Sequence, residues 1–201
     1  MFESILNNVA RFIDLTAEEK DQFTSVIQIK KLRKKQYLVQ EGDVCRFEAF
    51  INKGSMRSFS IDDKGYEHVV LFGIEDWWIG DLYSFFTQTP SRYNVEALED
   101  SELFCLDKPS LEKLYSDVPK FERFFRILIQ NAFIAQQQRI IANMSQSAEQ
   151  RYHDFINRYP QFEKRFPQYQ VASYLGIKPE SLSRIRRSIT KRGNSQPKNI
   201  S

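Results

Sequence analysis

The chain contains few of the residues from which catalytic and metal sites are usually built. Its 201 residues include two cysteines, Cys45 and Cys105, and two histidines, His68 and His153. Two separated cysteines outside any motif cannot supply a disulfide framework, a zinc site or an iron–sulfur cluster, and they are typical of reduced, buried thiols. Two histidines are too few for the ligand set of a metal-dependent β-barrel enzyme. We therefore expect no metal site, and we expect each histidine to be a packing or surface residue.

Long apolar runs are also missing. No run approaches the roughly 20 apolar residues that a helix needs to cross a membrane. Residues 1–8 lack a basic segment followed by an apolar one, so we expect no signal peptide. With 41% hydrophobic and 14% aromatic residues, the chain can nevertheless bury a core. The composition predicts a folded cytoplasmic protein of one large domain or two small ones, with no membrane partner.

Charge is distributed unevenly along the chain. Residues 145–201 hold 11 Lys/Arg and 4 Asp/Glu, a net charge of +7, whereas residues 1–144 hold 18 and 22, a net charge of −4. A basic end joined to an acidic body fits binding to a polyanion, although many proteins carry a solvated basic surface.

The first half of the chain has the pattern of one helix followed by short strands. Thr16 and Glu19 form a capping box that predicts a helix over residues 16–29. Short apolar runs then alternate with glycines at positions 42, 54, 65, 73 and 80, and Asp62–Gly65 has the composition of a hairpin turn. This spacing predicts a β-sandwich or β-roll across residues 30–107.

Residues 120–143 have the pattern of one long helix with a wide apolar face. That face is larger than one small β-domain can cover, so a second copy of the chain is the expected partner. The alternative is a helix that lies flat on its own β-domain. The residues expected at the dimer interface are Phe121, Phe125, Leu128, Ala132 and Ala135.

Residues 168–187 have the pattern of two helices joined by a sharp turn. Gly176 falls where the turn needs a left-handed backbone, and Pro179 suits the first position of the second helix. Before them, Ser147 and Gln150 fit a capping box for a new helix over residues 148–158. The inward positions of the two later helices are apolar: Val171, Leu175, Ile177, Leu182 and Ile185. The pattern indicates a helix-turn-helix, which places its second helix in the DNA major groove.

The outward residues of the second helix suit contact with DNA. Glu180 can accept a hydrogen bond from a cytosine amino group, and Arg184 can bind guanine O6 and N7. The alternative for this pair is an i,i+4 surface ion pair. The remaining candidates would bind phosphates: Lys178, Ser181, Ser183 and Arg187.

Together these patterns resemble the Crp/Fnr superfamily of bacterial transcription regulators. The resemblance lies in three blocks, Glu41–Asp43 with Asn52–Ser55, Ile79–Leu82 and Tyr174–Arg184, and it covers nearly the whole chain. It implies an α+β fold with a jelly-roll-like β-roll similar to a cyclic-nucleotide-binding domain, and a helix-turn-helix that is normally followed by a β-hairpin wing. Residues 188–201 of this chain have no alternating apolar run, so we expect the wing to be missing or reduced. The implied regions are an effector-sensing domain at residues 1–118, a dimerisation helix at 119–144, a DNA-binding domain at 145–190 and a flexible tail at 191–201.

The resemblance also implies an effector pocket, formed by Gly80, Asp81, Leu82, Ser91 and Arg92, with Gln136 and Gln137 on the long helix. Members that bind cyclic nucleotides carry Glu where this chain has Asp81 and Arg where it has Ser91. Arg92 comes one position late, which on a strand places it on the opposite face unless a bulge restores it. Both differences argue against cyclic nucleotide as the effector. For the two glutamines, a polar helix surface is the alternative.

The resulting hypothesis is a dimeric, sequence-specific DNA-binding transcription regulator. Its expected partners are a palindromic duplex, a second copy, RNA polymerase and an unidentified small-molecule effector, and no cofactor is assigned. One alternative is a module that senses a cyclic nucleotide or other small anion and acts through a protein partner without binding DNA. An enzyme is not expected, because the sequence shows no nucleophile–base pair, metal set or phosphate-binding glycine loop.

Overall fold

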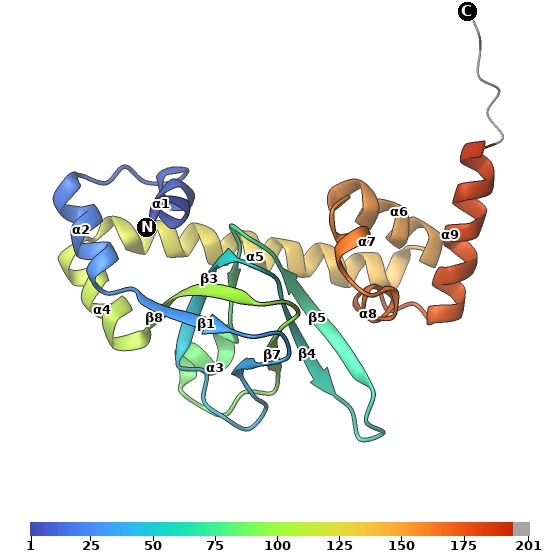
Figure 1. The fold of residues 1–201 in the computed structure, drawn as a ribbon, viewed down its shortest axis with the longest axis horizontal. Helices are drawn as coiled ribbons and strands as arrows, with labels where there is room; N and C mark the ends of the chain where they lie inside the picture. Colours follow the sequence, from blue (N-terminus) through green and yellow to red (C-terminus); the bar gives the residue numbers. More distant parts are fainter. Residues whose placement is uncertain (195–201) are drawn as a thin grey trace, which may run out of the picture. The chain divides into compact units, whose positions relative to one another are not determined.

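The computed structural model describes residues 1–194 (Figure 1). The chain divides into two compact units, Met1–Phe133 and Ile134–Ser201, and the boundary falls within one long helix. No helix among the described residues is both long enough and apolar enough to cross a membrane.

The first unit contains two four-stranded antiparallel sheets. One sheet has the order β1-β8-β3-β6 and the other the order β2-β7-β4-β5. The strands are β1 (Gln28–Leu32), β2 (Tyr37–Val39), β3 (Phe47–Lys53), β4 (Met56–Ile61), β5 (Glu67–Gly73), β6 (Trp78–Ile79), β7 (Asn94–Ala97) and β8 (Ser101–Asp107). The predicted β-roll is therefore confirmed, and its strands begin two residues before the expected range.

The β4–β5 hairpin has the turn expected at Asp62–Gly65. Asp62 Oδ1 accepts hydrogen bonds of 2.9 Å from the backbone N–H groups of Lys64 and Tyr66, and Gly65 has a φ of +82°. A left-handed backbone at this position favours glycine because it has no Cβ. His68 lies on this exposed hairpin, 2.8 Å from Asp62.

Helices surround the strands of the first unit. They are α1 (Glu3–Ala10), α2 (Ala17–Ser25), α3 (Leu82–Thr87) and α4 (Lys108–Asp117), together with the first part of α5 (Lys120–Ser145). The Thr16–Glu19 capping box is confirmed, but α2 ends at Ser25 and not at residue 29. The chain must be extended from Gln28 onward because β1 pairs with β8. The sequence patterns did not predict α1 or α3.

The start of α5 is part of the core of the first unit. Phe121 and Phe125 are 0% and 3% exposed, and the ring of Phe125 contacts Trp78. Leu128 packs against the same core. The prediction that Phe121 and Phe125 contact a second copy is therefore wrong, because α2, α4 and β6 of the same chain already contact their rings. Of the other two residues expected at that interface, Ala132 is exposed and Ala135 is half-buried.

The second unit consists of the end of α5 and four further helices. These are α6 (Ala148–Arg158), α7 (Phe162–Arg165), α8 (Gln168–Tyr174) and α9 (Pro179–Asn194). The Ser147–Gln150 capping box and the predicted helix over residues 148–158 are confirmed. The core is rich in aromatic rings, among them Tyr152, Phe155, Phe162 and Phe166.

Helix α9 is longer than expected. Residues 191–194 continue the helix, where the sequence predicted the start of a flexible tail. Residues 195–201, which the prediction also assigned to that tail, lie outside the described residues. Within residues 1–194 no strand follows β8, so that part of the chain contains no β-hairpin wing.

Candidate nucleic-acid interface

The turn between α8 and α9 has the geometry that a helix-turn-helix requires. Ile177 N donates to Ala172 O at 2.9 Å and Gly176 N donates to Ser173 O at 3.1 Å, the two hydrogen bonds of a Schellman motif. Gly176 has a φ of +62°, a conformation that costs other residues about 1–2 kcal/mol. Pro179 then starts α9, where its missing N–H is not needed.

Arg151 of α6 fixes this turn from outside. Its Nε donates to the carbonyl oxygen of Leu175 at 3.0 Å, and another guanidinium nitrogen donates to Gln146 O at 2.8 Å. Leu175 O lies at the end of α8, where carbonyl groups lack partners within the helix. Sequence reasoning missed this residue, because an arginine on an amphipathic helix has the pattern of an ordinary surface residue.

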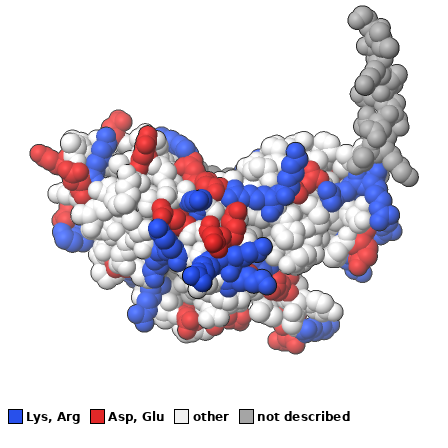
Figure 2. All heavy atoms as spheres, viewed as in Figure 1, with Lys and Arg blue, Asp and Glu red and all other residues white. Residues whose placement is uncertain are grey.

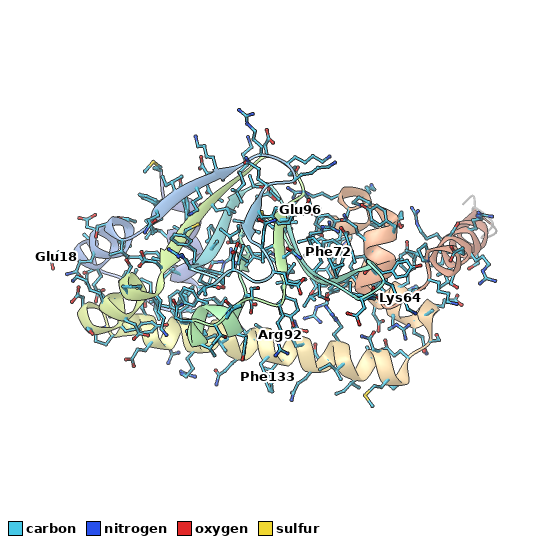
Figure 3. The ribbon with its side chains drawn as sticks, turned by 90° about the horizontal axis from the view of Figure 1, so that it is seen from below. Glu18, Lys64, Phe72, Arg92, Glu96 and Phe133 are labelled. Carbon is cyan, nitrogen blue, oxygen red and sulfur yellow. The ribbon has the colours of Figure 1, made fainter. Side chains whose placement is uncertain are left out.

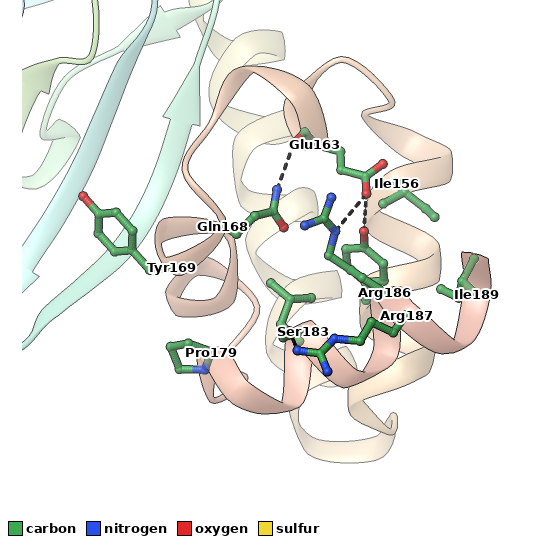
Figure 4. A pocket seen from close by; sticks show the side chains of 11 residues that line it. Ile156, Glu163, Gln168, Tyr169, Pro179, Ser183, Arg186, Arg187 and Ile189 are labelled. Carbon is green, nitrogen blue, oxygen red and sulfur yellow. Dashed lines mark hydrogen bonds and ion pairs between the residues drawn. The ribbon is translucent and has the colours of Figure 1, made fainter. Parts of the chain in front are cut away.

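The inner face of α9 packs on α6 and α8, and an ion pair joins α9 to α7. Leu182 is 1% exposed, and Arg186, one turn later, donates from Nε to Glu163 Oε1 at 3.3 Å. The same carboxylate oxygen accepts a 2.5 Å hydrogen bond from Tyr152 Oη (Figure 4). Burial, and then the bond to Glu163, raise the pKa of Tyr152 to about 12, so its hydroxyl stays protonated.

The outer face of α9 carries the residues expected to contact bases. Glu180, Arg184 and Arg187 recur at i, i+4 and i+7 and are exposed. Arg184 donates to Ser181 Oγ and Arg187 to Ser183 Oγ, both at 3.2 Å. Among the described residues Arg184 makes no ion pair with Glu180, so its guanidinium is bound only to a neutral hydroxyl.

The remaining phosphate-contact candidate, Lys178, is exposed just before α9. Figure 2 shows Lys and Arg side chains along this helix, next to the grey residues. All six residues expected to contact DNA therefore lie on α9 or directly before it.

A groove of about 730 Å³ lies beside this face, lined by residues of α6, α7, α8 and α9 (Figure 4). Tyr152, Ile156 and Leu182 give it an apolar lining, and Ser183 and Arg187 line it from the outer side of α9. The hydroxyl and guanidinium groups that we expect to bind phosphate thus lie at the edge of a concave surface.

Two of the residues expected at the effector pocket, Asp81 and Ser91, are bound to each other. Ser91 Oγ donates to Asp81 Oδ2 at 2.7 Å and also lies 2.9 Å from Tyr93 O. Asp81 in addition caps α3 by accepting from Ser84 N at 3.2 Å. Asp81 and Ser91 are each 3% exposed. A buried carboxylate offers only acceptor oxygens, so these two positions do not suit the phosphate of a cyclic nucleotide.

A second buried acid lies beside this pair. Glu48 of β3 is 5% exposed, and its Oε2 has no hydrogen-bond partner among the described residues. Burial, and then the charge of Asp81, raise the pKa of Glu48 to about 8. A Cβ atom on Gly80 would lie 2.4 Å from Glu48 Oε2, so a larger residue there would force the Glu48 carboxyl group to move. Sequence reasoning did not single out Glu48, because a glutamate in a strand is usually exposed.

The other pocket candidates are less enclosed. Leu82 begins α3 and is half-buried, and Arg92 is exposed and points out of the β-roll (Figure 3). Gln136 and Gln137 are exposed on α5. They belong to the second compact unit, whereas the rest of the pocket belongs to the first.

An ion network occupies the other sheet of the β-roll. Arg57 of β4, whose side chain is 6% exposed, binds Glu96 of β7 at 2.7 Å and Glu67 of β5 at 2.5 Å. Its guanidinium also lies 4.0 Å from the centre of the Phe59 ring. The cation is therefore fully compensated by the protein, which leaves little positive charge for an anionic ligand.

Both cysteines are free and buried, as the sequence predicted. Burial raises the pKa of Cys45 to about 11, and it raises the pKa of Cys105 as well. Thiols in this state are poor nucleophiles and poor metal ligands.

The sequence is similar to a known domain family and to known regulatory proteins. Residues 29–117 match the family described as the cyclic nucleotide-binding domain. The fumarate and nitrate reduction regulatory protein of Vibrio cholerae is 27% identical over 185 residues, which is 85% of this chain and 72% of that protein.

Solved structures share the fold. FixK2 from Bradyrhizobium japonicum superposes with a TM-score of 0.73 at 15% identity, over 87% of this chain and 90% of that one. A regulator assigned to the crp/fnr family from Eubacterium rectale gives a TM-score of 0.67 at 18% identity, over 90% and 86% of the two chains.

Proposed function

The chain belongs to the Crp/Fnr superfamily of bacterial transcription regulators, and we propose that it acts as a homodimer whose two α9 helices read a palindromic DNA duplex. The observation that carries this proposal is the exposed row of Glu180, Arg184 and Arg187 on a helix held by the Gly176 turn. Within the described part of the chain the Arg184 guanidinium is bound to a serine hydroxyl, and guanine O6 and N7 can replace that hydroxyl as acceptors. Bidentate contacts of this kind each contribute about 1–3 kcal/mol of discrimination between bases.

The remaining polar groups on this face suit the DNA backbone. Ser181, Ser183 and Arg187 flank Arg184 within one turn of the helix, and Lys178 comes just before it. Short hydroxyls and long cations are the common ligands of phosphate oxygens, and they fix the register of a helix in the groove. We assign base reading to Glu180 and Arg184 and backbone contact to the other four residues.

The second half of α5 supplies the proposed dimer contact. Ile127, Ile134 and Ile141 are spaced seven residues apart, and so are Phe133 and Ile140, which is the heptad spacing of a two-helix coiled coil. Four of these residues, and Met144 three residues after Ile141, are 50% to 84% exposed in a single chain: Phe133, Ile134, Ile140, Ile141 and Met144. Phe133 projects from α5 on the side away from the β-roll (Figure 3). A row of apolar side chains this exposed favours a second copy as its cover.

The opposite face of α5 is already occupied by the chain itself. Arg139 lies 4.7 Å from the centre of the Tyr174 ring, and Ala135 and Ala142, four residues before and three after it, are half-buried. Two α5 helices paired through the heptad face would therefore leave both helix-turn-helix units packed as they are. In a two-fold dimer, the two α9 helices would enter successive major grooves about 34 Å apart.

The effector of the proposed regulator is not a cyclic nucleotide bound through Asp81 and Ser91. The mutual hydrogen bond of these residues and the uncompensated carboxyl of Glu48 support this part of the proposal. An iron–sulfur effector does not suit the chain either, since Cys45 and Cys105 are its only cysteines and both are buried. We propose a different small molecule as the signal, and RNA polymerase as the partner that receives it.

In vitro selection from random duplexes tests the function, with the full chain present and with cyclic AMP or cyclic GMP either added or left out. We expect enrichment of a palindrome whose half-sites lie one helical turn apart, with the same sequences and affinity in all arms. Enrichment of no sequence would overturn DNA reading and favour a sensor that acts through a protein partner. Enrichment only with a cyclic nucleotide would overturn the proposed divergence of the pocket.

A further inference from the structure

Four basic residues, Lys178, Arg184, Arg186 and Arg187, lie within ten positions of one another around the start of α9, but they do not have equivalent surroundings. Arg184 and Arg187 bind serine hydroxyls on the outer face. Arg186 instead belongs to the row Leu182, Arg186 and Ile189, spaced at i, i+4 and i+7, whose first member is 1% exposed. Arg186 thus lies on the side of α9 that faces α7, and its side chain is 41% exposed.

The partner of Arg186 is a carboxylate from a different helix. Glu163 of α7 accepts from Arg186 Nε at 3.3 Å and from Tyr152 Oη at 2.5 Å, so one oxygen joins α6, α7 and α9 (Figure 4). Gln168 Nε2 donates to the backbone oxygen of Glu163 at 2.9 Å and ties α7 to the start of α8. Tyr152 is 1% exposed, so the carboxylate is fixed by a group that cannot move into solvent.

This arrangement has an electrostatic consequence for DNA. Nonspecific affinity for duplex DNA grows with the number of phosphates that the protein neutralises. Each neutralised phosphate steepens the fall of log affinity with log salt concentration by about 0.9. A cation that stays paired with a carboxylate of its own chain does not add to that number, whatever other hydrogen bonds the carboxylate accepts. Sequence preference is greatest when few cations bind phosphate without reading bases.

We propose that Glu163 is a specificity-determining positioning residue, which neutralises Arg186 and keeps it out of the DNA contact, so that Arg184 reads the base and nonspecific binding stays low. This inference rests on the proposed function. It assigns a role in duplex discrimination to a residue of α7 that does not lie on the recognition helix.

The test uses the full chain and three variants, Glu163→Gln, the double variant Glu163→Gln with Arg186→Gln, and Tyr152→Phe. Glu163→Gln keeps an oxygen acceptor for Tyr152 but removes the negative charge, and the double variant removes both charges. Tyr152→Phe is the matched control, since it removes a hydrogen bond to the same oxygen and leaves the ion pair intact. Affinities for the selected palindrome and for an unrelated duplex of equal length are measured between 0.05 and 0.3 M NaCl, values chosen to resolve the salt slope of about 0.9 per phosphate.

We expect Glu163→Gln to bind the unrelated duplex about five- to tenfold more tightly at 0.1 M salt, with a slope steeper by about 0.9 per protomer. The double variant and Tyr152→Phe should both keep the wild-type slope.

Equal slopes for Glu163→Gln and wild type, with weaker binding to both duplexes, would show a purely structural role and overturn the inference. A double variant with a slope shallower than wild type would also overturn it, because Arg186 would then already contact phosphate. If the wild type bound neither duplex, the proposed function itself would fail, and the inference would fail with it.

Discussion

Ser91 Oγ lies 2.7 Å from Asp81 Oδ2, and the two side chains are each almost completely buried. The bond joins the residue that caps α3 to the segment that leads into β7. A hydroxyl and a carboxylate paired in this way satisfy one another without a ligand. The bond therefore holds the interior of the β-roll together at two of the positions that we predicted for an effector pocket.

Replacing Ser91 with Ala should lower the free energy of unfolding of the first unit by about 1–3 kcal/mol, because a buried acceptor on Asp81 loses its donor. Urea denaturation followed by tryptophan fluorescence measures this change, since Trp77 and Trp78 both lie in the first unit. Ser116→Ala on the exposed side of α4 is the control and should change stability by less than about 0.5 kcal/mol. Equal midpoints for the two variants would mean that the Ser91–Asp81 bond does not stabilise the roll.

Glu48 predicts a pH dependence of stability. Its pKa is about 8 in the folded chain, against 4.5 for an unperturbed glutamate carboxyl, so the folded state favours the protonated form. Protonated Glu48 therefore stabilises the folded state fully below about pH 4.5. As the pH rises toward 8, the free energy of unfolding falls by about 1.4 kcal/mol per pH unit. Urea denaturation from pH 5 to 8 should show this decline in the wild type and a flatter profile in Glu48→Gln.

The matched control for Glu48 is Glu41→Gln, which changes an exposed glutamate of the same unit. Its pH profile should follow that of the wild type. A Glu48→Gln profile that falls as steeply as the wild type would assign the decline to other groups and remove Glu48 as its cause.

The sequence predicted the helix-turn-helix well because its determinants are local. The Gly176 turn, the Pro179 helix start and the Ser147–Gln150 capping box each depend on residues within five positions of one another. Hydrogen bonds at that range form wherever the backbone is helical, so residue types at fixed spacing are sufficient to identify them.

The features that the sequence did not predict depend on contacts between distant segments. The bond from Arg151 to Leu175 spans 24 positions, and the pairing of Arg57 with Glu96 spans 39. The faces of α5 illustrate the same limit. Residues at i and i+4 identify an apolar face such as that of Phe121 and Phe125, but the spacing does not say whether the chain's own sheets or a second copy covers it.

The heptad face of α5 gives a prediction for the oligomeric state. Ile134→Asp combined with Ile141→Asp should convert the dimer to a monomer at micromolar concentration, because two charges would face their copies across an apolar interface. Sedimentation equilibrium measures the change. Asn143→Asp is the control and should remain dimeric, because this exposed position lies two residues after Ile141 and therefore on another side of the helix. A wild-type chain that sediments as a monomer would contradict the assignment of this face.

Arg184 and Arg187 should differ in what they contribute to DNA binding, although they lie three residues apart on the same helix. Arg184→Ala should weaken binding to the selected palindrome by about 1–3 kcal/mol and relax the preference at one base pair in each half-site, because a bidentate base contact is lost. Arg187→Ala should weaken binding to all duplexes alike and reduce the salt slope by about one per half-site, because a phosphate contact is lost.

Selection with each variant, followed by titration of the enriched and unrelated duplexes, separates these two effects. Lys113→Ala on α4, which pairs with Asp117 in the first unit, controls for a general loss of positive charge and should leave both measurements unchanged. If Arg184→Ala selected the same sequences with the wild-type affinity, the base contact would have to be reassigned to another residue of α9. If both arginine variants instead lost affinity equally for every duplex, α9 would bind the backbone alone, and sequence preference would have to come from the shape of the DNA.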